Sequence, residues 1–400
     1  MSKSIRRVGK IALLLSGVVF FLSCWIVLPA PTYFFLILGI AAPEVSPWLL
    51  VLNGIALLAL INIRPKYFQL ALVASLTGIL LSALPLLQLP ATQQQMAVAM
   101  QSALGADYTA EIGERQMPDT NGTLARSQPF VLADVFTGIR RPKYRYTQNI
   151  QFALPDSVPL SMNIYRPLKV GKYPALVVIY GGAWQNGNPA KDAQFNSYMA
   201  ERGYTVFAID YRHAPRYRFP DQLNDVQTAI TFIRQHATEY EADPKRLALL
   251  GRSSGAHLAM LAAYQPDAPP IRAVVNYYGP VNLTEGYADP PRPDPLNVRT
   301  LLTAFIGGSP TQLPQQYQLA SPINYVKPQL PPTLLVYGSR DHVVQARFGR
   351  QISQRLHSVG NTAILLEIPW AEHAFDAIFS GVSNQLALYY TERFLAWALR

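Results

Sequence analysis

The sequence predicts an α/β domain, built on a mostly parallel sheet with helices on both faces, that follows about three transmembrane helices. Most of the long apolar runs of the 400-residue chain fall within residues 1–90. From about residue 142, short runs rich in Val, Ile and Leu alternate with helix-like segments, which indicates a parallel sheet. The predicted organisation is a membrane segment over 1–90, a linker with a short amphipathic helix over 91–141 and the α/β domain over 142–400.

Three apolar runs in the membrane segment are long enough to be spans: 11–28, 48–63 and 67–89. The first contains no charged residue and would measure about 27 Å as a helix, close to the thickness of a bilayer core. A further run over 32–42 lies between two prolines and is too short to span. We interpret it as an interfacial or re-entrant piece, or as a kinked continuation of the first helix.

Basic residues in the membrane segment predict where the rest of the chain lies. They gather at the amino terminus and around 64–66, and the loop over 29–46 contains no Lys or Arg. With three spans, both basic groups lie in the cytoplasm and the positive-inside rule is satisfied. We therefore expect an integral membrane protein whose α/β domain lies on the extracytoplasmic, periplasmic or outer, face. A single cleaved signal peptide would leave the two later runs unexplained.

Charge and cysteine content argue against several classes of protein. The formal net charge is +10, and the six basic residues and one acidic residue of 1–90 contribute +5 of it. The other basic residues are scattered among acids, so we expect no nucleic-acid partner. The single cysteine, Cys24, allows no disulfide framework within the chain. Histidines and acids lack metal-ligand spacing, so no metal and no cofactor are expected. The oligomeric state is left open.

The stretch over 91–141 differs from its neighbours. Met96, Met100 and Leu104 lie at helical spacing, which predicts a short amphipathic helix. The Gly-, Asn- and Asp-containing stretch over 113–129 is interpreted as a linker that holds the following domain off the membrane. The alternative is that it packs on that domain as an extra arm.

Two strand-like runs begin the α/β domain, 144–152 and 161–167, and they are predicted to pair antiparallel. Helical patterns over 219–237 and 343–360 lie among the strands that follow. Six further apolar runs are predicted strands: 173–180, 204–210, 246–251, 273–279, 333–338 and 363–369. Ligands of such sheets bind beyond the carboxyl ends of the strands, so chemistry is sought in the residues that follow these runs.

A Gly-Arg-Ser-Ser-Gly turn over 251–255 joins one predicted strand directly to a helical pattern. In a strand–turn–helix context, the middle residue, Ser253, is exposed on a strained corner, and the flanking glycines leave room for the neighbouring strand and helix. The amino terminus of the helix favours negative charge that develops in front of the serine. The turn therefore predicts a nucleophilic Ser253.

A serine nucleophile needs a base, and the base needs an acid that orients it. His373 lies in a loop just past the last apolar run, and Asp341 follows the preceding strand. The chain order Ser253, Asp341, His373 is the order that α/β hydrolases use. His257 is interpreted as a packing histidine, and Asp376, a rival acid, as the cap of the following helix.

The chain from about 143 to 400 resembles the α/β-hydrolase fold. Within it, the chain is similar to the carboxylesterases of the hormone-sensitive-lipase type and to the bacterial acetyl and feruloyl esterase-like group. The resemblance does not extend to the membrane segment. Five motifs carry it: YGGAW at 180–184, DYRHAP at 210–215, GRSSGAHLA at 251–259, GSRDHVV at 338–344 and EHAFD at 372–376.

The resemblance implies a serine hydrolase that cleaves carboxylic esters through an acyl-enzyme. It implies an oxyanion hole formed by the backbone amides of Gly182, Ala183 and Ser254. Tyr180 stands where the family has histidine. Ala183 replaces a glycine, which is harmless only if its φ is negative. Taken together, the resemblance and the apolar runs of 1–90 lead us to expect a small-molecule or lipid ester and the membrane as partners.

Two other functions stay open. A serine peptidase of the prolyl-oligopeptidase kind shares the fold and the order of the triad, although no propeller-like repeats precede residue 142. A non-catalytic hydrolase-like scaffold typically loses a triad member, and all three are present here. The Pro-rich stretch over 280–316 is expected to shape the substrate pocket. Asp210, Arg212 and Asp225 are interpreted as structural.

Overall fold

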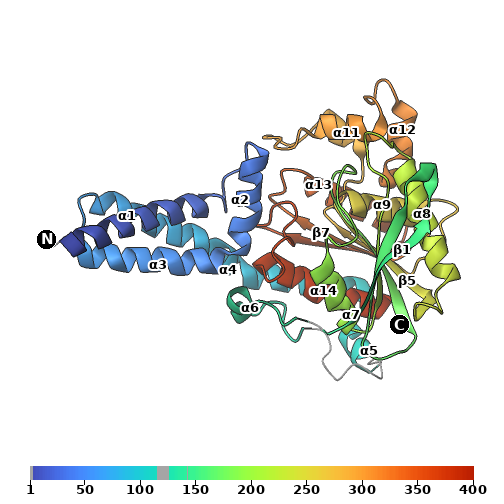
Figure 1. The fold of residues 1–400 in the computed structure, drawn as a ribbon, viewed down its shortest axis with the longest axis horizontal. Coiled ribbons are helices and arrows are strands. Elements are labelled where there is room, and N and C mark those ends of the chain that lie inside the picture. Colours follow the sequence, from blue (N-terminus) through green and yellow to red (C-terminus); the bar gives the residue numbers. More distant parts are fainter. Residues whose placement is uncertain (1–2, 115–125, 142) are drawn as a thin grey trace.

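The computed structural model of the chain describes residues 3–114, 126–141 and 143–400. It contains a bundle of long helices and an α/β domain, with the amino terminus at the far end of the bundle and the carboxyl terminus on the domain (Figure 1). The expected stretch 113–129 falls largely outside the described residues.

The described residues form an eight-stranded sheet in the order β1-β2-β4-β3-β5-β6-β7-β8. β1 pairs with β2 and β2 with β4 antiparallel, and all other neighbours are parallel. This confirms the predicted mostly parallel sheet and its antiparallel start. The bounds are β1 Arg145–Ala153, β2 Leu160–Arg166, β3 Tyr173–Ile179, β4 Thr205–Ile209, β5 Ala242–Arg252, β6 Ala273–Tyr277, β7 Thr333–Gly338 and β8 Ala363–Ile368.

Helices cover both faces of the sheet (Figure 1). α8 packs against α9, and an ion pair between Arg202 and Glu392 joins α7 to α14. The central strands are buried along their whole length, as expected for strands covered on both sides. The bounds are α7 Ala193–Glu201, α8 Asp221–Gln235, α9 Ser254–Tyr264, α13 Arg347–Ser358 and α14 Val382–Ala398.

The stretch over 280–316 contains short helices above the carboxyl ends of the strands. They are α10 Leu283–Ala288, α11 Val298–Ile306 and α12 Pro314–Leu319. Asn282 and Asn297 cap the first two, each accepting a hydrogen bond from a backbone N–H three residues later. The insertion is therefore a folded cap above the sheet.

Three helices among the described residues are long and apolar enough to cross a membrane. These are α1 Lys3–Cys24, α3 Ser46–Ile63 and α4 Phe68–Leu104. The shorter α2, Tyr33–Glu44, lies between α1 and α3 at the end of the bundle that meets the α/β domain.

Buried polar side chains join the three long helices. Ser23 lies 3.0 Å from Ser82, and Asn53 donates to the Ser23 hydroxyl at 3.0 Å. Ser16 and Ser75 form a second pair at 3.0 Å. Such hydrogen bonds between helices fix their packing where water is excluded.

The expected boundary at residue 90 differs from the structure. α4 runs without a break through Pro85 and Pro90, so the predicted amphipathic helix is the continuation of the third apolar run. Met96 and Met100 are buried in the core of the α/β domain. The apolar face of the helix continues past the prolines, and its packing against β8 and α14 offsets the hydrogen bonds that proline removes.

The described residues at the end of the 113–129 stretch, which begin at Arg126, pack on the domain. The Arg126 guanidinium donates to Asp134 at 2.8 Å and to Gln385 of α14 at 2.7 Å. Here the chain follows the alternative interpretation, a packed arm. Two short helices, α5 Tyr108–Glu114 and α6 Leu132–Thr137, flank the stretch.

Candidate active site

Ser253 lies between the end of β5 and the start of α9, in a strained conformation with a positive φ of +51° and ψ −120°. The two glycines of the turn are required by close packing. A Cβ on Gly255 would lie 2.1 Å from the Ile179 carbonyl oxygen, and one on Gly251 would lie 2.3 Å from Gly255. The strained corner is therefore held by the neighbouring strand and helix.

The structure brings Ser253, His373 and Asp341 together. His373 Nε2 lies 3.0 Å from Ser253 Oγ, and His373 Nδ1 lies 2.8 Å from Asp341 Oδ2. The other carboxylate oxygen of Asp341 accepts from the backbone amides of Val343 and Val344, both at 2.7 Å. These contacts fix the carboxylate, so it can hold the imidazole with Nε2 toward the serine.

Asp341 is buried, and burial raises the pKa of its carboxyl group. The neighbouring His373 and the backbone donors oppose that shift, since they favour the ionised carboxylate. The His373 imidazole is therefore hydrogen-bonded to a buried Asp341 carboxylate. This arrangement suits an imidazole that takes a proton from a hydroxyl group.

The loop after β3 lies in front of Ser253. Ala183 has φ +54°, so its conformation is left-handed, where an added methyl group is unfavourable. In the described part of the chain, no protein group accepts from the backbone amides of Ala183 and Ser254, and both residues line the cavity around Ser253. Among the described residues, these two amides are therefore donors without an acceptor at the wall of the cavity.

Gly182 differs from the expectation. Its backbone N–H donates to the Ser254 hydroxyl oxygen at 3.0 Å, so this donor is already engaged. The side chain of Ser254 reaches across to the loop, which family motifs alone do not reveal. An oxyanion role for Gly182 requires that this hydrogen bond be given up.

Tyr180, at the start of the same loop, is held by its side-chain contacts. Its hydroxyl donates to Asp210 at 2.5 Å and lies 2.9 Å from His213 Nε2, and its ring stacks on Tyr211 with centroids 4.6 Å apart. Burial raises the pKa of Tyr180, so the phenol remains a donor. Asp210, interpreted as structural, therefore acts on the loop through Tyr180.

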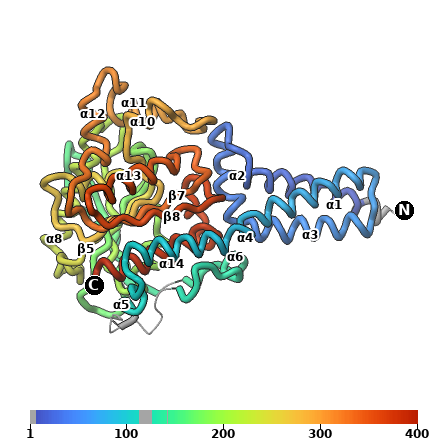
Figure 2. Tube along the Cα trace, turned by 180° about the vertical axis from the view of Figure 1, so that it is seen from behind, coloured from blue at the N-terminus to red at the C-terminus, as the bar shows by residue number. Residues whose placement is uncertain are grey.

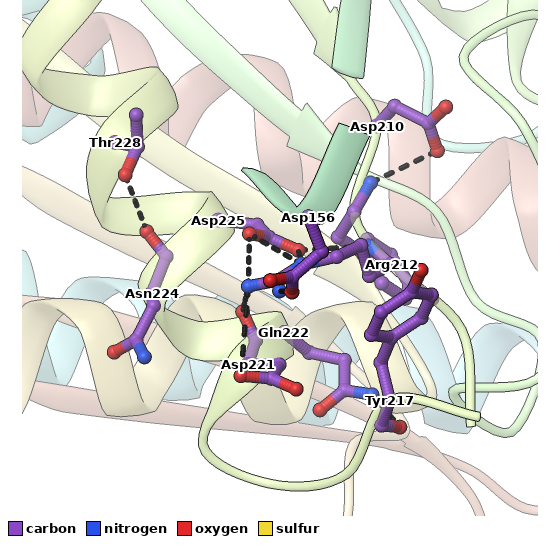
Figure 3. A network of polar contacts seen from close by, with 10 residues as sticks. Asp156, Asp210, Arg212, Tyr217, Asp221, Gln222, Asn224, Asp225 and Thr228 are labelled. Atoms are coloured by element: carbon purple, nitrogen blue, oxygen red, sulfur yellow. Dashed lines mark hydrogen bonds and ion pairs between the residues drawn. The ribbon is translucent and has the colours of Figure 1, made fainter. Parts of the chain in front are cut away.

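Arg212 has a structural position, in agreement with its interpretation. Figure 3 shows its guanidinium among three carboxylates, from Asp156, Asp221 and Asp225. It binds Asp225 of α8 through Nε and Nη2 at 3.0 and 2.9 Å. This bidentate pair ties the 210–215 motif to the helix behind it.

Asp376 is not a helix cap, and that interpretation was wrong. Its carboxylate accepts from the guanidinium of Arg252 and from the hydroxyl of Tyr278, and α14 begins six residues later, at Val382. The buried guanidinium beside Ser253 attracts the carboxylate more strongly than a distant helix start. Asp341 is the acid that reaches His373.

His257 packs as predicted but also holds the loop, which sequence reasoning missed. Its Nδ1 accepts from Trp184 Nε1 at 3.2 Å, and its Nε2 donates to the Ala320 carbonyl at 2.6 Å. Burial lowers the pKa of His257 to about 4, so the ring is neutral. The sequence feature that could have indicated this contact is Trp184, at the end of the YGGAW motif, because a buried indole N–H needs an acceptor.

A cavity of about 740 Å³ contains Ser253 and His373. Its walls come from the YGGAW loop, from α7, from the 280–316 insertion and from Tyr33 of α2. The volume is that of a site for a small organic ligand. Apolar lining residues include Leu283, Leu296, Val298, Leu301, Leu302, Val343, Val344 and Phe348. The described residues contain no group of three His, Cys, Asp or Glu side chains that could hold a metal ion.

Ala183→Gly is expected to stabilise the protein by about 1 kcal/mol, because glycine adopts positive φ without the Cβ penalty. Thermal unfolding of the two proteins in the same detergent measures the difference. Gly138→Ala, at another positive-φ position, should destabilise by a similar amount. An equal or lower unfolding temperature for Ala183→Gly would contradict the strain inferred here.

Comparisons with known proteins agree with this geometry. The family model described as BD-FAE matches residues 162–356. The probable carboxylic ester hydrolase LipM of Mycobacterium tuberculosis is 30% identical, over 86% of this chain and 81% of LipM. Esterase LipC of the same organism is 31% identical, over 58% of this chain and 61% of LipC.

A solved structure of Thermogutta terrifontis esterase 2, phosphonylated by sarin, is also similar. It superposes with a TM-score of 0.53 at 26% identity, covering 64% of this chain and 94% of that chain. The fold, the strand–turn–serine–helix and the relatives agree with one another. The chain therefore belongs to the serine carboxylesterases of the α/β-hydrolase fold and is a carboxylic ester hydrolase.

Proposed function

We propose that this carboxylic ester hydrolase is anchored in a membrane and uses Ser253, His373 and Asp341 as its catalytic triad. The single observation that supports the triad best is the continuous hydrogen-bonded line from Ser253 Oγ through the His373 ring to Asp341, on the wall of the cavity. The three long apolar helices support the anchor.

In the first half of the reaction, Ser253 Oγ attacks the ester carbonyl carbon while its proton passes to His373 Nε2. Asp341 holds the imidazole and stabilises the positive charge that forms on it. The tetrahedral intermediate then expels the alcohol, which takes the proton from His373 Nε2, and an acyl-enzyme on Ser253 remains. Water then attacks the carbonyl carbon of the acyl-enzyme while its proton passes to His373 Nε2. The second tetrahedral intermediate releases the carboxylic acid, and the proton returns to Ser253 Oγ.

The oxyanion of each intermediate is bound by the backbone amides of Ala183 and Ser254. The amino terminus of α9 lies directly behind Ser253, and its dipole favours the same negative charge. Gly182 supplies a third donor only if its N–H leaves the Ser254 hydroxyl. Each such donor is worth on the order of a hundredfold in rate.

The membrane orientation is part of the proposal. The basic residues at the amino terminus and at Arg64 and Lys66 favour a cytoplasmic position for both, which leaves the α/β domain on the extracytoplasmic face. Cysteine accessibility on either side of sealed vesicles tests this, with Cys24 replaced and one cysteine introduced at the exposed Leu168. Labelling from the cytoplasmic side would reverse the orientation.

A fluorophosphonate probe tests the nucleophile on the full-length protein. Related esterase 2 forms a phosphonyl adduct with sarin, so the same chemistry is expected here. Mass spectrometry should find the adduct on Ser253, and p-nitrophenyl esters should block labelling in competition. Faster turnover of peptide anilides than of p-nitrophenyl esters would favour the peptidase alternative, and an unlabelled Ser253 would contradict the triad.

A further inference from the structure

The cavity around Ser253 extends to the membrane segment. Tyr33 contributes to its lining, and every other lining residue belongs to the α/β domain. Tyr33 is the first residue of α2. Figures 1 and 2 show α2 between the bundle and the α/β domain, running across the direction of α1 and α3. One end of the cavity therefore lies at the level where the bundle meets the domain.

Contacts at both ends of α2 hold the helix against the α/β domain. Before α2, the guanidinium of Arg340 donates to the Val27 carbonyl. At the end of α2, Glu44 is completely buried and its carboxylate accepts from the backbone N–H of Ser383 at 2.8 Å. Ser383 lies in the first turn of α14, and Arg340 adjoins Asp341. The bundle is thus docked on the domain beside the active site.

The outer surface of α2 is apolar and aromatic. Tyr33, Phe34 and Ile37 are 62%, 65% and 48% exposed, and Trp48 at the start of α3 is 42% exposed. Aromatic side chains at the end of an apolar bundle are typical of the boundary between membrane and water. The exposed apolar surface continues along the bundle through Ile11, Leu14, Val18, Phe21, Val51, Ile55, Leu58 and Leu80. Exposed apolar side chains on several helices of one bundle fit a lipid bilayer.

The wall that the insertion contributes to the cavity suits a hydrocarbon chain. Most of its side chains there are apolar, and Leu301 and Leu302 come from α11, in which Leu302, Phe305 and Ile306 are buried. Polar groups that lie in the same cavity, Ser253 and His373, face the position of the ester. An elongated amphiphile can therefore place its chain against the insertion and its carbonyl at the serine.

We infer that the enzyme takes amphiphilic carboxylic esters directly from the bilayer. The hydrocarbon chain passes Tyr33 at the level of the membrane boundary and lies against the apolar wall of the insertion, while the ester group reaches Ser253. The substrate class is a bilayer-dissolved ester with a long chain. The inference rests on the proposed function, since it assumes that Ser253 is the nucleophile and that the bundle spans a membrane.

Surface dilution tests the route. The full-length protein is placed in vesicles of dialkyl ether phosphatidylcholine, which contains no carboxylic ester bond, and p-nitrophenyl palmitate is dissolved in them. Tenfold more vesicle lipid at constant ester should lower the palmitate rate about tenfold, because the membrane retains long chains. The rate on water-soluble p-nitrophenyl acetate should change less than about twofold. A palmitate rate independent of dilution would overturn the inference, whereas loss of both activities would count against the proposed function.

Two neighbouring substitutions locate the route. Tyr33 and Phe34 are almost equally exposed, but only Tyr33 lines the cavity. In Tyr33→Asp, the ratio of palmitate to acetate rates should fall about tenfold, because a charge opposes passage of a hydrocarbon chain. The matched Phe34→Asp should keep the ratio within about twofold. Equal losses in both variants, or no loss in Tyr33→Asp, would overturn the route, and fluorophosphonate labelling checks that each variant is folded.

Discussion

Ser253→Ala is expected to lower kcat/KM for p-nitrophenyl ester hydrolysis by about 10⁴-fold or more, because no other group can form the acyl-enzyme. The His373–Asp341 pair remains in place, but the imidazole then has no hydroxyl to deprotonate. Residual turnover comes from binding and from the oxyanion donors acting on water. Steady-state rates of the purified full-length protein measure the loss.

Ser254→Ala is the matched control, because it removes the adjacent hydroxyl and leaves the backbone amide. It should retain activity within about tenfold, since no oxyanion donor is removed. The substitution also frees the Gly182 N–H, which donates a hydrogen bond to the Ser254 hydroxyl oxygen in the structure. If Ser254→Ala abolished turnover and Ser253→Ala did not, the assignment of the nucleophile would be wrong.

Local patterns explain why the sheet could be predicted from the sequence. β3, β4, β6 and β7 are short, largely apolar runs that are buried throughout. The candidate triad could be predicted from the sequence for a related reason. Ser253, Asp341 and His373 each follow a strand of the same parallel sheet. Parallel strands bring their carboxyl ends to one edge.

Other features depend on contacts between distant segments. The positive φ of Ala183 is set by how the whole loop folds over β5 and α9, and the residue type does not reveal it. Tyr180 lies 30 residues before its partner Asp210. The continuation of α4 past Pro90 depends on packing against the domain, since the sequence marks only the prolines. The position of Tyr33 in the cavity depends on how the bundle docks.

The buried guanidinium of Arg252, beside Ser253, leads to the largest expected effect on stability. The Arg252 side chain is 7% exposed, contacts Asp376 and lies 3.5 Å from Asp192. Its guanidinium also lies 4.5 Å from the centre of the Phe195 ring. Burial raises the pKa of Asp192, and the charge of Arg252 opposes that shift. The arginine thus contacts two buried carboxylates beside the strained corner.

Arg252→Met should destabilise the protein by about 3–5 kcal/mol, because it leaves both carboxylates buried without a cation. The unfolding temperature in detergent should fall by roughly 6–20 °C. Arg350→Met is the matched control, since Arg350 pairs with Glu367 at 2.7 Å but is half exposed, and its loss should cost about 1 kcal/mol or less.

The double variant Arg252→Met, Asp376→Asn separates the lost ion pair from lost packing. Neutralising Asp376 removes one of the two uncompensated charges, so the double variant should unfold at a higher temperature than Arg252→Met alone. Asp376→Asn alone should destabilise less than Arg252→Met, because Asp192 remains beside the arginine. If the single and double variants unfolded at the same temperature, the loss would come from the guanidinium's packing against Phe195 and Tyr277 and not from its charge.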